Sequence, residues 1–228
     1  TIQCWVWPTT PKTHPKYWKH GAQGLVTKWH QDTGYGIFIN EDGCAELRIN
    51  GEKITTGAPI RDHAWHFLAA SYDAQTGEAI LYHEPQVVYA LDPVIPPVSK
   101  KVSGPIKHDG SPVVIAGYTG EHSNDPTAKS SVPSGIVING HYNGKIDSPR
   151  ICDRALSRAD IETMKQGAQR GLTERRNAGP TGELSKCIVA AWDFSDGINT
   201  IVGKDHGPYV FDAQIVNCPT RALTGHNF

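Results

Sequence analysis

The chain has 228 residues, and 22 Lys and Arg stand against 23 Asp and Glu, so its formal net charge is −1 at pH 7. A chain of this length suits one large all-β domain or two small ones. The near-neutral balance gives no basic field that would favour nucleic acid. No apolar run approaches the ~20 residues that span a membrane. The sequence opens at Thr1 within an alternating pattern, and we expect it to be a piece of a longer polypeptide.

The cysteines are odd in number and widely spaced, and none forms a C-x-x-C motif: Cys4, Cys44, Cys152, Cys187 and Cys218. This spacing argues against a disulfide framework and against a zinc knuckle. Most of these cysteines lie in apolar, strand-like contexts, where a free thiol packs as a small hydrophobe. We therefore expect free, buried thiols, which suit a reducing, cytoplasmic location.

Short strands separated by Gly, Pro and Asp turns fill the first half of the chain. Residues 1–8 alternate, with Cys4 and Val6 on one face and Trp5 and Trp7 on the other, which predicts a strand covered on both sides. Further predicted strands are residues 25–29, 35–40, 45–49, 65–72 and 78–83. The last two form the clearest hairpin, and its turn ends at Gly77, where positive φ costs little.

The second half predicts further strands at residues 113–117, 144–151, 187–194 and 209–216. Residues 85–112 are rich in proline and predict a long loop with an edge strand at 86–90. Residues 172–186 are hydrophilic and predict a surface linker. Helix is scarce, so the fold class is all-β, with two antiparallel sheets and one short capping helix.

That helix is predicted by two local devices. Ser157 is a good N-cap, and Asp160 lies three residues on, where the partner of a capping box sits. Leu156 and Ile161 have the spacing of a hydrophobic staple. We expect Ile161 and Met164 to lie on the buried side of this helix.

Three segments resemble the laminin-G-like, concanavalin A-like jelly roll. Residues 65–73 read WHFLAASYD and residues 76–82 read TGEAILY, as in a central hairpin of that family. Residues 144–157, GKIDSPRICDRALS, are similar to the family's closing signature, and TIQCWV at 1–6 resembles an early strand. The resemblance spans most of residues 1–171 and implies a two-sheet antiparallel jelly roll.

Residues 188–194 (IVAAWDF), 205–208 (DHGP) and 212–217 (DAQIVN) resemble the segment that normally opens such a domain. This implies a circularly permuted sandwich, in which residues 187–228 return to supply the first strands and residues 1–228 form a single domain. If those first strands were missing, the neighbouring strands would have unpaired edges. The alternative is a second domain that begins at residue 187.

Residues 192–199 and 217–228 resemble the large subunit of N,N-dimethylformamidase and its relatives. In that family a jelly-roll module precedes an amidohydrolase region, which cleaves a C–N amide bond with a mononuclear iron held by tyrosines and a glutamate. None of those ligands can be matched to a position in this sequence. The resemblance thus implies an accessory module without cofactor, whose partners are the adjoining catalytic domain and other subunits of a hydrolase.

The residues themselves predict no catalytic group and no metal site. A glycosidase would need paired carboxylates, and no E-x-D-x-E run occurs; Glu46 and Arg48 share a strand face, which we interpret as a surface ion pair. Ser195 lacks the glycines of a G-x-S-x-G elbow. His63 and His66 would point to opposite faces of a strand, which excludes a metal pair. In the family, the aspartate at the position of Asp147 is a turn residue rather than a calcium ligand.

One loop carries a candidate contact site for a ligand or partner. Residues 9–21 hold two histidines and two large aromatics: His14, Tyr17, Trp18 and His20. Aromatic side chains on loops stack on sugars or pack against proteins. A second loop holds His122, Asn124 and Asp125. Two functions follow as expectations: a structural accessory module of a larger amidase, or a lectin-like module that binds carbohydrate.

Overall fold

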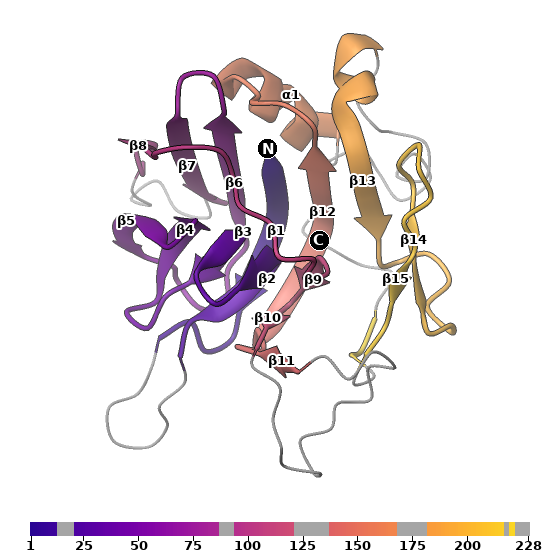
Figure 1. Ribbon diagram of the computed structural model, residues 1–228. Helices are drawn as coiled ribbons and strands as arrows, with labels where there is room; N and C mark the ends of the chain where they lie inside the picture. Colours follow the sequence, from indigo (N-terminus) through magenta and orange to yellow (C-terminus); the bar gives the residue numbers. More distant parts are fainter. Residues whose placement is uncertain (13–20, 87–93, 121–136, 168–181, 217–218, 222–228) are drawn as a thin grey trace.

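A computed structural model describes residues 1–12, 21–86, 94–120, 137–167, 182–216 and 219–221. Two antiparallel sheets pack face to face, and one short helix, α1, lies outside them (Figure 1). The predicted all-β sandwich with a capping helix is therefore confirmed.

The larger sheet has eight strands, in the order β15 (Ala213–Gln214), β14 (Val202–Asp205), β13 (Ile188–Asp193), β12 (Gly144–Cys152), β1 (Ile2–Pro8), β6 (His66–Asp73), β7 (Glu78–Pro85) and β8 (Val98–Lys101). The second sheet has five, in the order β5 (Glu52–Pro59), β4 (Cys44–Ile49), β3 (Thr33–Ile39), β2 (Gln23–His30) and β9 (Val114–Ile115). β10 (Tyr118–Thr119) and β11 (Ile138–Asn139) form a separate ribbon. The first strand lies in the middle of the larger sheet, where Ile2 pairs with both Ile151 and Ala70.

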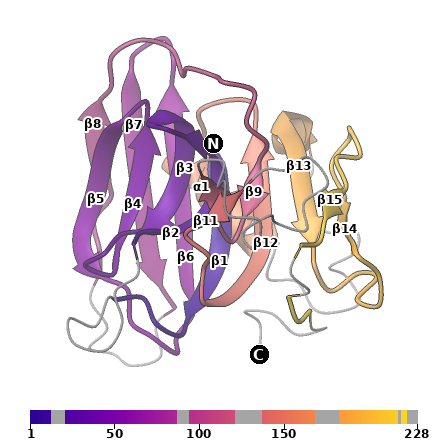
Figure 2. The same cartoon turned by 60° about the horizontal axis from the view of Figure 1, so that its bottom comes forward.

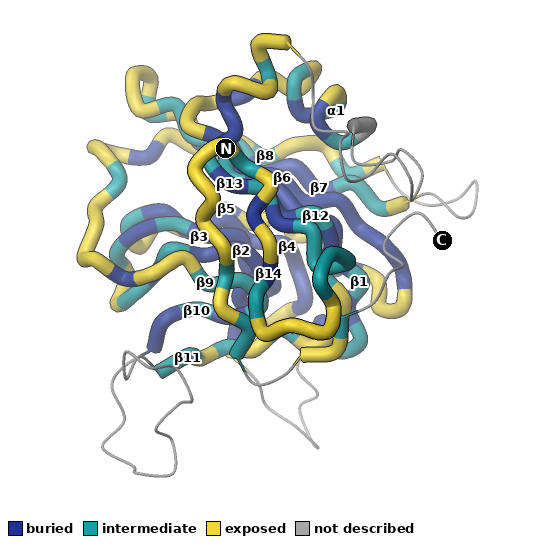
Figure 3. The backbone as a smooth tube through the Cα atoms, turned by 90° about the vertical axis from the view of Figure 1, so that its right-hand side faces the viewer, coloured by how far each residue is buried: buried dark blue, intermediate teal, exposed yellow. Residues whose placement is uncertain are grey.

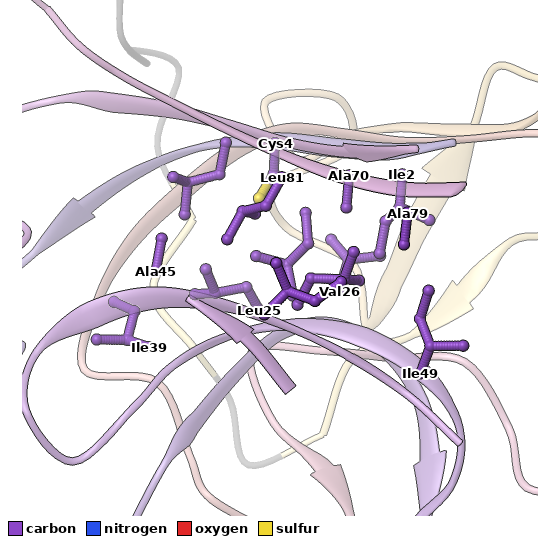
Figure 4. Close-up of a cluster of buried hydrophobic side chains, with 14 of the residues drawn as sticks. Ile2, Cys4, Leu25, Val26, Ile39, Ala45, Ile49, Ala70, Ala79 and Leu81 are labelled. Atoms are coloured by element: carbon purple, nitrogen blue, oxygen red, sulfur yellow. The ribbon is translucent and has the colours of Figure 1, made fainter. Parts of the chain in front are cut away.

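The core lies between the sheets and follows from the two-residue period of each strand. Ile2, Cys4 and Val6 point inward from β1, and they meet side chains of the five-stranded sheet such as Leu25 and Ile39 (Figure 4). Trp5 faces the other way and is buried in a second cluster, under α1. The prediction that this strand is covered on both sides is confirmed.

The helix α1 (Arg158–Gly167) begins as predicted. The backbone N–H of Asp160 donates to Ser157 Oγ at 3.2 Å, and the N–H of Ser157 donates to Asp160 Oδ2 at 3.2 Å, which is a reciprocal capping box. Leu156 and Ile161 are both buried in the cluster that α1 covers. Met164 is buried there too, so the apolar side of the helix lies on the outer face of the larger sheet.

Five strands escaped prediction: β5, β8, β10, β11 and β14. β5 and β8 are the ends of their sheets, and their exposed residues are mostly polar or charged. Polar edge strands carry little hydrophobic period, because polar side chains there protect the sheet from further pairing. Of the predicted edge strand at 86–90, Gln86 lies outside any strand, and the remaining residues fall outside the described ranges.

Residues 188–214 extend the larger sheet beyond β12. β13 pairs with β12 through Arg150 and Ala191, and β14 and β15 follow in turn (Figures 1 and 2). The predicted strand at 209–216 is reduced to Ala213–Gln214, because residues 207–211 form a loop. Of the predicted linker at 172–186, residues 172–181 lie outside the described ranges, and a 3₁₀ helix, η1, runs from Gly182 to Cys187.

Four cysteines fall within the described residues, and all are free and buried: Cys4, Cys44, Cys152 and Cys187. This confirms the expected free thiols at those positions, and Cys218 lies outside the described ranges. Among the described residues, no helix is long and apolar enough to cross a membrane.

Candidate ligand-binding face

The predicted contact loop starts and returns at the outer face of the five-stranded sheet. His14, Tyr17, Trp18 and His20 themselves lie outside the described residues. On one side of them, Lys12 packs on the β3–β4 turn, where a Cβ on Gly43 would lie 3.1 Å from the Lys12 Cβ. On the other side, Ala22 is buried with Trp29 and Phe38. His122, Asn124 and Asp125 also lie outside the described residues.

A buried ion pair occupies the middle of this outer face. Ile39 and Leu47 point into the core, so Phe38, Glu46 and Arg48 point outward. Arg48 Nε donates to Glu46 Oε1 at 2.6 Å, and the guanidinium carbon lies 4.3 Å from the centre of the Phe38 ring. Asn40 Nδ2 donates to Glu46 Oε2 at 3.5 Å.

This pair corrects one expectation. The sequence predicts a surface ion pair, and the two residues do pair, but their side chains are only 10% and 7% exposed. The reason is position: β4 lies between β3 and β5 rather than at an edge, and the Arg48 guanidinium stacks over Phe38 of the neighbouring strand. A charged pair held in this way is weakly screened and strongly oriented.

Two further aromatic side chains pack around Phe38. Trp29 and Tyr118 both contact Phe38, with ring centres 5.8 Å and 5.6 Å apart. Thr27 Oγ1 donates to the Gly117 carbonyl at 2.8 Å, which fixes the segment carrying Tyr118 over β2. Phe38 is fully buried and Trp29 is 4% exposed, so these rings support the face from beneath, whereas Tyr118 is partly exposed.

A separate cavity of about 350 Å³ opens between the two sheets at one end of the sandwich. Its inner wall is apolar, formed by side chains such as Leu47, Ile49 and Ile106. The hydroxyl of Tyr72 donates to the Gly104 carbonyl at 2.5 Å. Burial raises the pKa of Tyr35, another lining residue, so its phenol stays protonated. The inner part of the cavity therefore offers apolar surface, and polar side chains that include His108, Asp153 and Arg154 also line it.

Sequence reasoning missed a buried histidine pair. His66 Nδ1 and His83 Nε2 lie 3.0 Å apart, and His66 Nε2 lies 3.0 Å from the Arg61 carbonyl oxygen. Burial, with the charge of His66 as the second cause, lowers the pKa of His83 to about 3. The pairing follows from register: His66 lies opposite Pro85, two residues beyond His83 on the same face.

The expectation that His63 and His66 lie on opposite faces of one strand is wrong. His63 precedes β6, has a φ of 53°, and packs its ring edge against Trp7 at 5.0 Å. The two histidines therefore do not share a strand: His63 lies before β6, and His66 is its first residue.

The remaining candidates serve the architecture. Arg150 is buried, and its Nη1 donates to the carbonyl of Met164 at 2.9 Å. Asp147 is also buried and accepts a hydrogen bond from Ser148 Oγ. Ser195 Oγ donates to Asp193 Oδ1 at 2.5 Å, as in a turn. Within the described ranges, no three or more His, Cys, Asp or Glu side chains are grouped to hold a metal ion.

No family model matches the sequence. Two curated relatives are named N,N-dimethylformamidase beta subunit: that of Paracoccus aminophilus is 29% identical over 249 residues, and that of Alcaligenes sp. is 24% identical over 253. Each match covers 100% of this chain and 29% of the relative, so the chain spans under a third of the length of the curated relatives that it matches. The sequence resemblance pointed to a large subunit, whereas these relatives are named as beta subunits.

Among solved structures, that of a proposed carbohydrate binding protein from Bacteroides ovatus superposes with a TM-score of 0.50 at 11% identity. The superposition covers 98% of this chain and 55% of that one. Identity this low supports the β-sandwich fold alone.

Proposed function

We propose that this chain is a non-catalytic accessory module of a larger amide hydrolase related to N,N-dimethylformamidase, and that it packs against the catalytic domain and other subunits. The observation that carries the proposal is the coverage of the matches. Each relative is matched over the whole of this chain but over only 29% of its own length. A segment of a larger enzyme with its own sandwich core has the properties of an accessory domain.

The polar side chains support this assignment, because they are engaged in holding elements together. Arg150 fastens α1 to β12, Ser195 closes a turn, and Arg48 is neutralised by Glu46. A catalytic acid or base must instead reach a proton on a substrate. Free buried cysteines also support a reducing compartment such as the cytoplasm.

Two oxygen donors of the required kinds are already engaged within this chain, which supports an iron site elsewhere. A tyrosine and glutamate set would need free oxygen donors that converge on one point. Glu46 is engaged with Arg48 and Asn40, and the Tyr72 hydroxyl donates to Gly104. We propose that iron is held elsewhere in the larger protein.

The test is to purify residues 1–228 and to measure dimethylformamide hydrolysis and iron content. We expect a folded chain with neither activity nor stoichiometric iron. Hydrolysis by the purified chain, or one iron per chain, would contradict the proposal.

Carbohydrate binding is the second candidate, and the sandwich fold shared with the proposed carbohydrate binding protein from Bacteroides ovatus favours it. A glycan array, run with and without calcium, tests it. If the outer face binds sugar, Tyr118→Ala, at a partly exposed ring on that face, abolishes the signal, whereas Arg154→Gln, at a side chain 53% exposed, leaves it unchanged. An array without hits under both conditions removes this candidate.

A further inference from the structure

The loop between β14 and β15 exposes a run of large apolar side chains. Tyr209, Val210 and Phe211, here called the apolar tip, are 64%, 69% and 53% exposed. Contiguous exposed apolar surface of this kind marks an interaction site more often than scattered single residues do. Figure 3 views the molecule from the side of β14, where much of the tube is exposed.

The apolar tip is held in place by buried polar groups. The carboxylate of Asp205, which is itself buried, accepts hydrogen bonds from the backbone N–H of Ala191, Gly207 and Phe211, each at 2.7 Å. Trp192 Nε1 donates to the Phe211 carbonyl at 2.9 Å. Several independent hydrogen bonds therefore fix the loop to β13.

The geometry of the tip itself is unusual for its residues. The φ of Val210 is 55°, a left-handed conformation that is costly for a β-branched residue. The rings of Tyr209 and Phe211 stack with centres 5.7 Å apart. The loop thus keeps a strained backbone while its apolar side chains stay in solvent, which stability alone does not explain.

The polar and charged side chains around the tip already have partners. Lys204 Nζ lies 2.5 Å from Asp212 Oδ2, and His206 Nε2 lies 3.6 Å from Asp196 Oδ2. A surface with an aromatic centre and a neutralised polar rim matches an uncharged, apolar partner.

The last described residue, Arg221, lies against the turn that precedes β14. The guanidinium of Arg221 donates to the carbonyls of Asp196, Val202 and Thr200 at 3.3, 3.0 and 2.7 Å, and also to that of Gly197. More than two thirds of each curated relative lies outside the matched region. Under the proposed accessory function, these other domains supply the partner that the apolar tip would meet.

We propose that the apolar tip forms the docking surface for another domain of the longer polypeptide, one that presents an uncharged apolar face. This inference rests on the proposed accessory function and names the surface that performs it.

Hydroxyl-radical footprinting tests the proposal by comparing residues 1–228 with the longer polypeptide. We expect labelling of Tyr209 and Phe211 to fall roughly tenfold in the longer polypeptide, because water is excluded from an interface centre. Equal labelling in both would overturn the docking surface. It would leave the accessory assignment standing, since hydrolysis and iron content decide that separately.

A variant series supplies a second readout. Tyr209→Ser combined with Phe211→Ser lowers the unfolding midpoint of the longer polypeptide and leaves that of residues 1–228 unchanged. The control is Val94→Ser, at a residue 90% exposed and close in sequence to β8, which is at the opposite end of the larger sheet. An equal loss in both proteins would contradict the proposal. So would a dimer of residues 1–228 that the double variant dissociates, because a second copy would then be the occupant.

Discussion

His66 and His83 meet inside the sandwich, where β6 begins and β7 ends. The low pKa of His83 means that the folded chain holds this imidazole neutral, whereas the unfolded chain protonates it near pH 6.5. Between about pH 6.5 and pH 3 the unfolded state therefore binds one more proton. The stability that depends on neutral His83 is fully present above pH 6.5 and is lost as the pH falls.

We predict that the free energy of unfolding drops by about 2 kcal/mol between pH 7 and pH 5 on account of this residue. His83→Leu should flatten that pH dependence, and His63→Gln, at an exposed histidine, should leave it as in the wild type. Urea unfolding at several pH values measures the slopes. An unchanged slope in His83→Leu would show that the pair does not govern acid sensitivity.

The Glu46–Arg48 pair makes a second prediction at this scale. Arg48→Met leaves Glu46 buried without its countercharge, and should cost about 3–5 kcal/mol of unfolding free energy. Combining it with Glu46→Leu should restore much of the loss, because an apolar pair needs no countercharge. The control is Lys100→Met, which breaks an exposed pair with Glu52 and should cost less than about 1 kcal/mol. Additive losses in the double variant would refute the coupling.

At the scale of elements, the attachment of α1 to the larger sheet depends on one buried side chain of β12, Arg150. The hydrogen bond from Arg150 to the Met164 carbonyl joins the last turns of the helix to the sheet. Arg150→Met should cost about 2 kcal/mol, because it leaves a buried carbonyl without its donor. Arg154→Met, at an exposed position four residues on, should change stability by less than about 1 kcal/mol. Equal effects of the two variants in denaturant unfolding would rule out this role for Arg150.

How far sequence predicts an element depends on whether its cause is local. The start of α1 was predictable because Ser157, Asp160 and Leu156 are neighbours in sequence and form the cap themselves. β5 and β8 were not, because polar edge strands carry no apolar period.

The same contrast between local and distant causes applies to the candidate site. A two-residue period places Glu46 and Arg48 on one face of a strand. Their burial depends on Phe38 of the adjacent strand, and the meeting of His66 with His83 depends on the register of β6 against β7. Neither packing nor register is a property of one segment.

For the whole molecule, the question is how residues 187–228 relate to the rest. We propose one domain, because β13 completes the edge of β12 and Cys187 lies in the cluster beneath α1. Burial, with Cys187 as the second cause, raises the pKa of the Cys152 thiol to about 12, so native Cys152 should be unreactive.

A chain ending at Lys186 tests the single domain. We expect the exposed β12 edge to cause aggregation, visible by light scattering, and Cys152 to react with a thiol reagent. Cys4, which is fully buried between the sheets, serves as the internal control and should stay protected. If the shortened chain matched the stability of the whole, residue 187 would mark a domain boundary instead.

The central place of β1 bears on how the protein is made. Its two neighbours, β6 and β12, begin at His66 and Gly144, so β1 leaves the ribosome well before either can pair with it. Contacts between residues as distant as Ile2 and Ile151 slow folding, since a long loop must close first. During translation, both edges of an apolar strand stay open to wrong partners. We expect the nascent chain to need a chaperone until Cys152 has emerged.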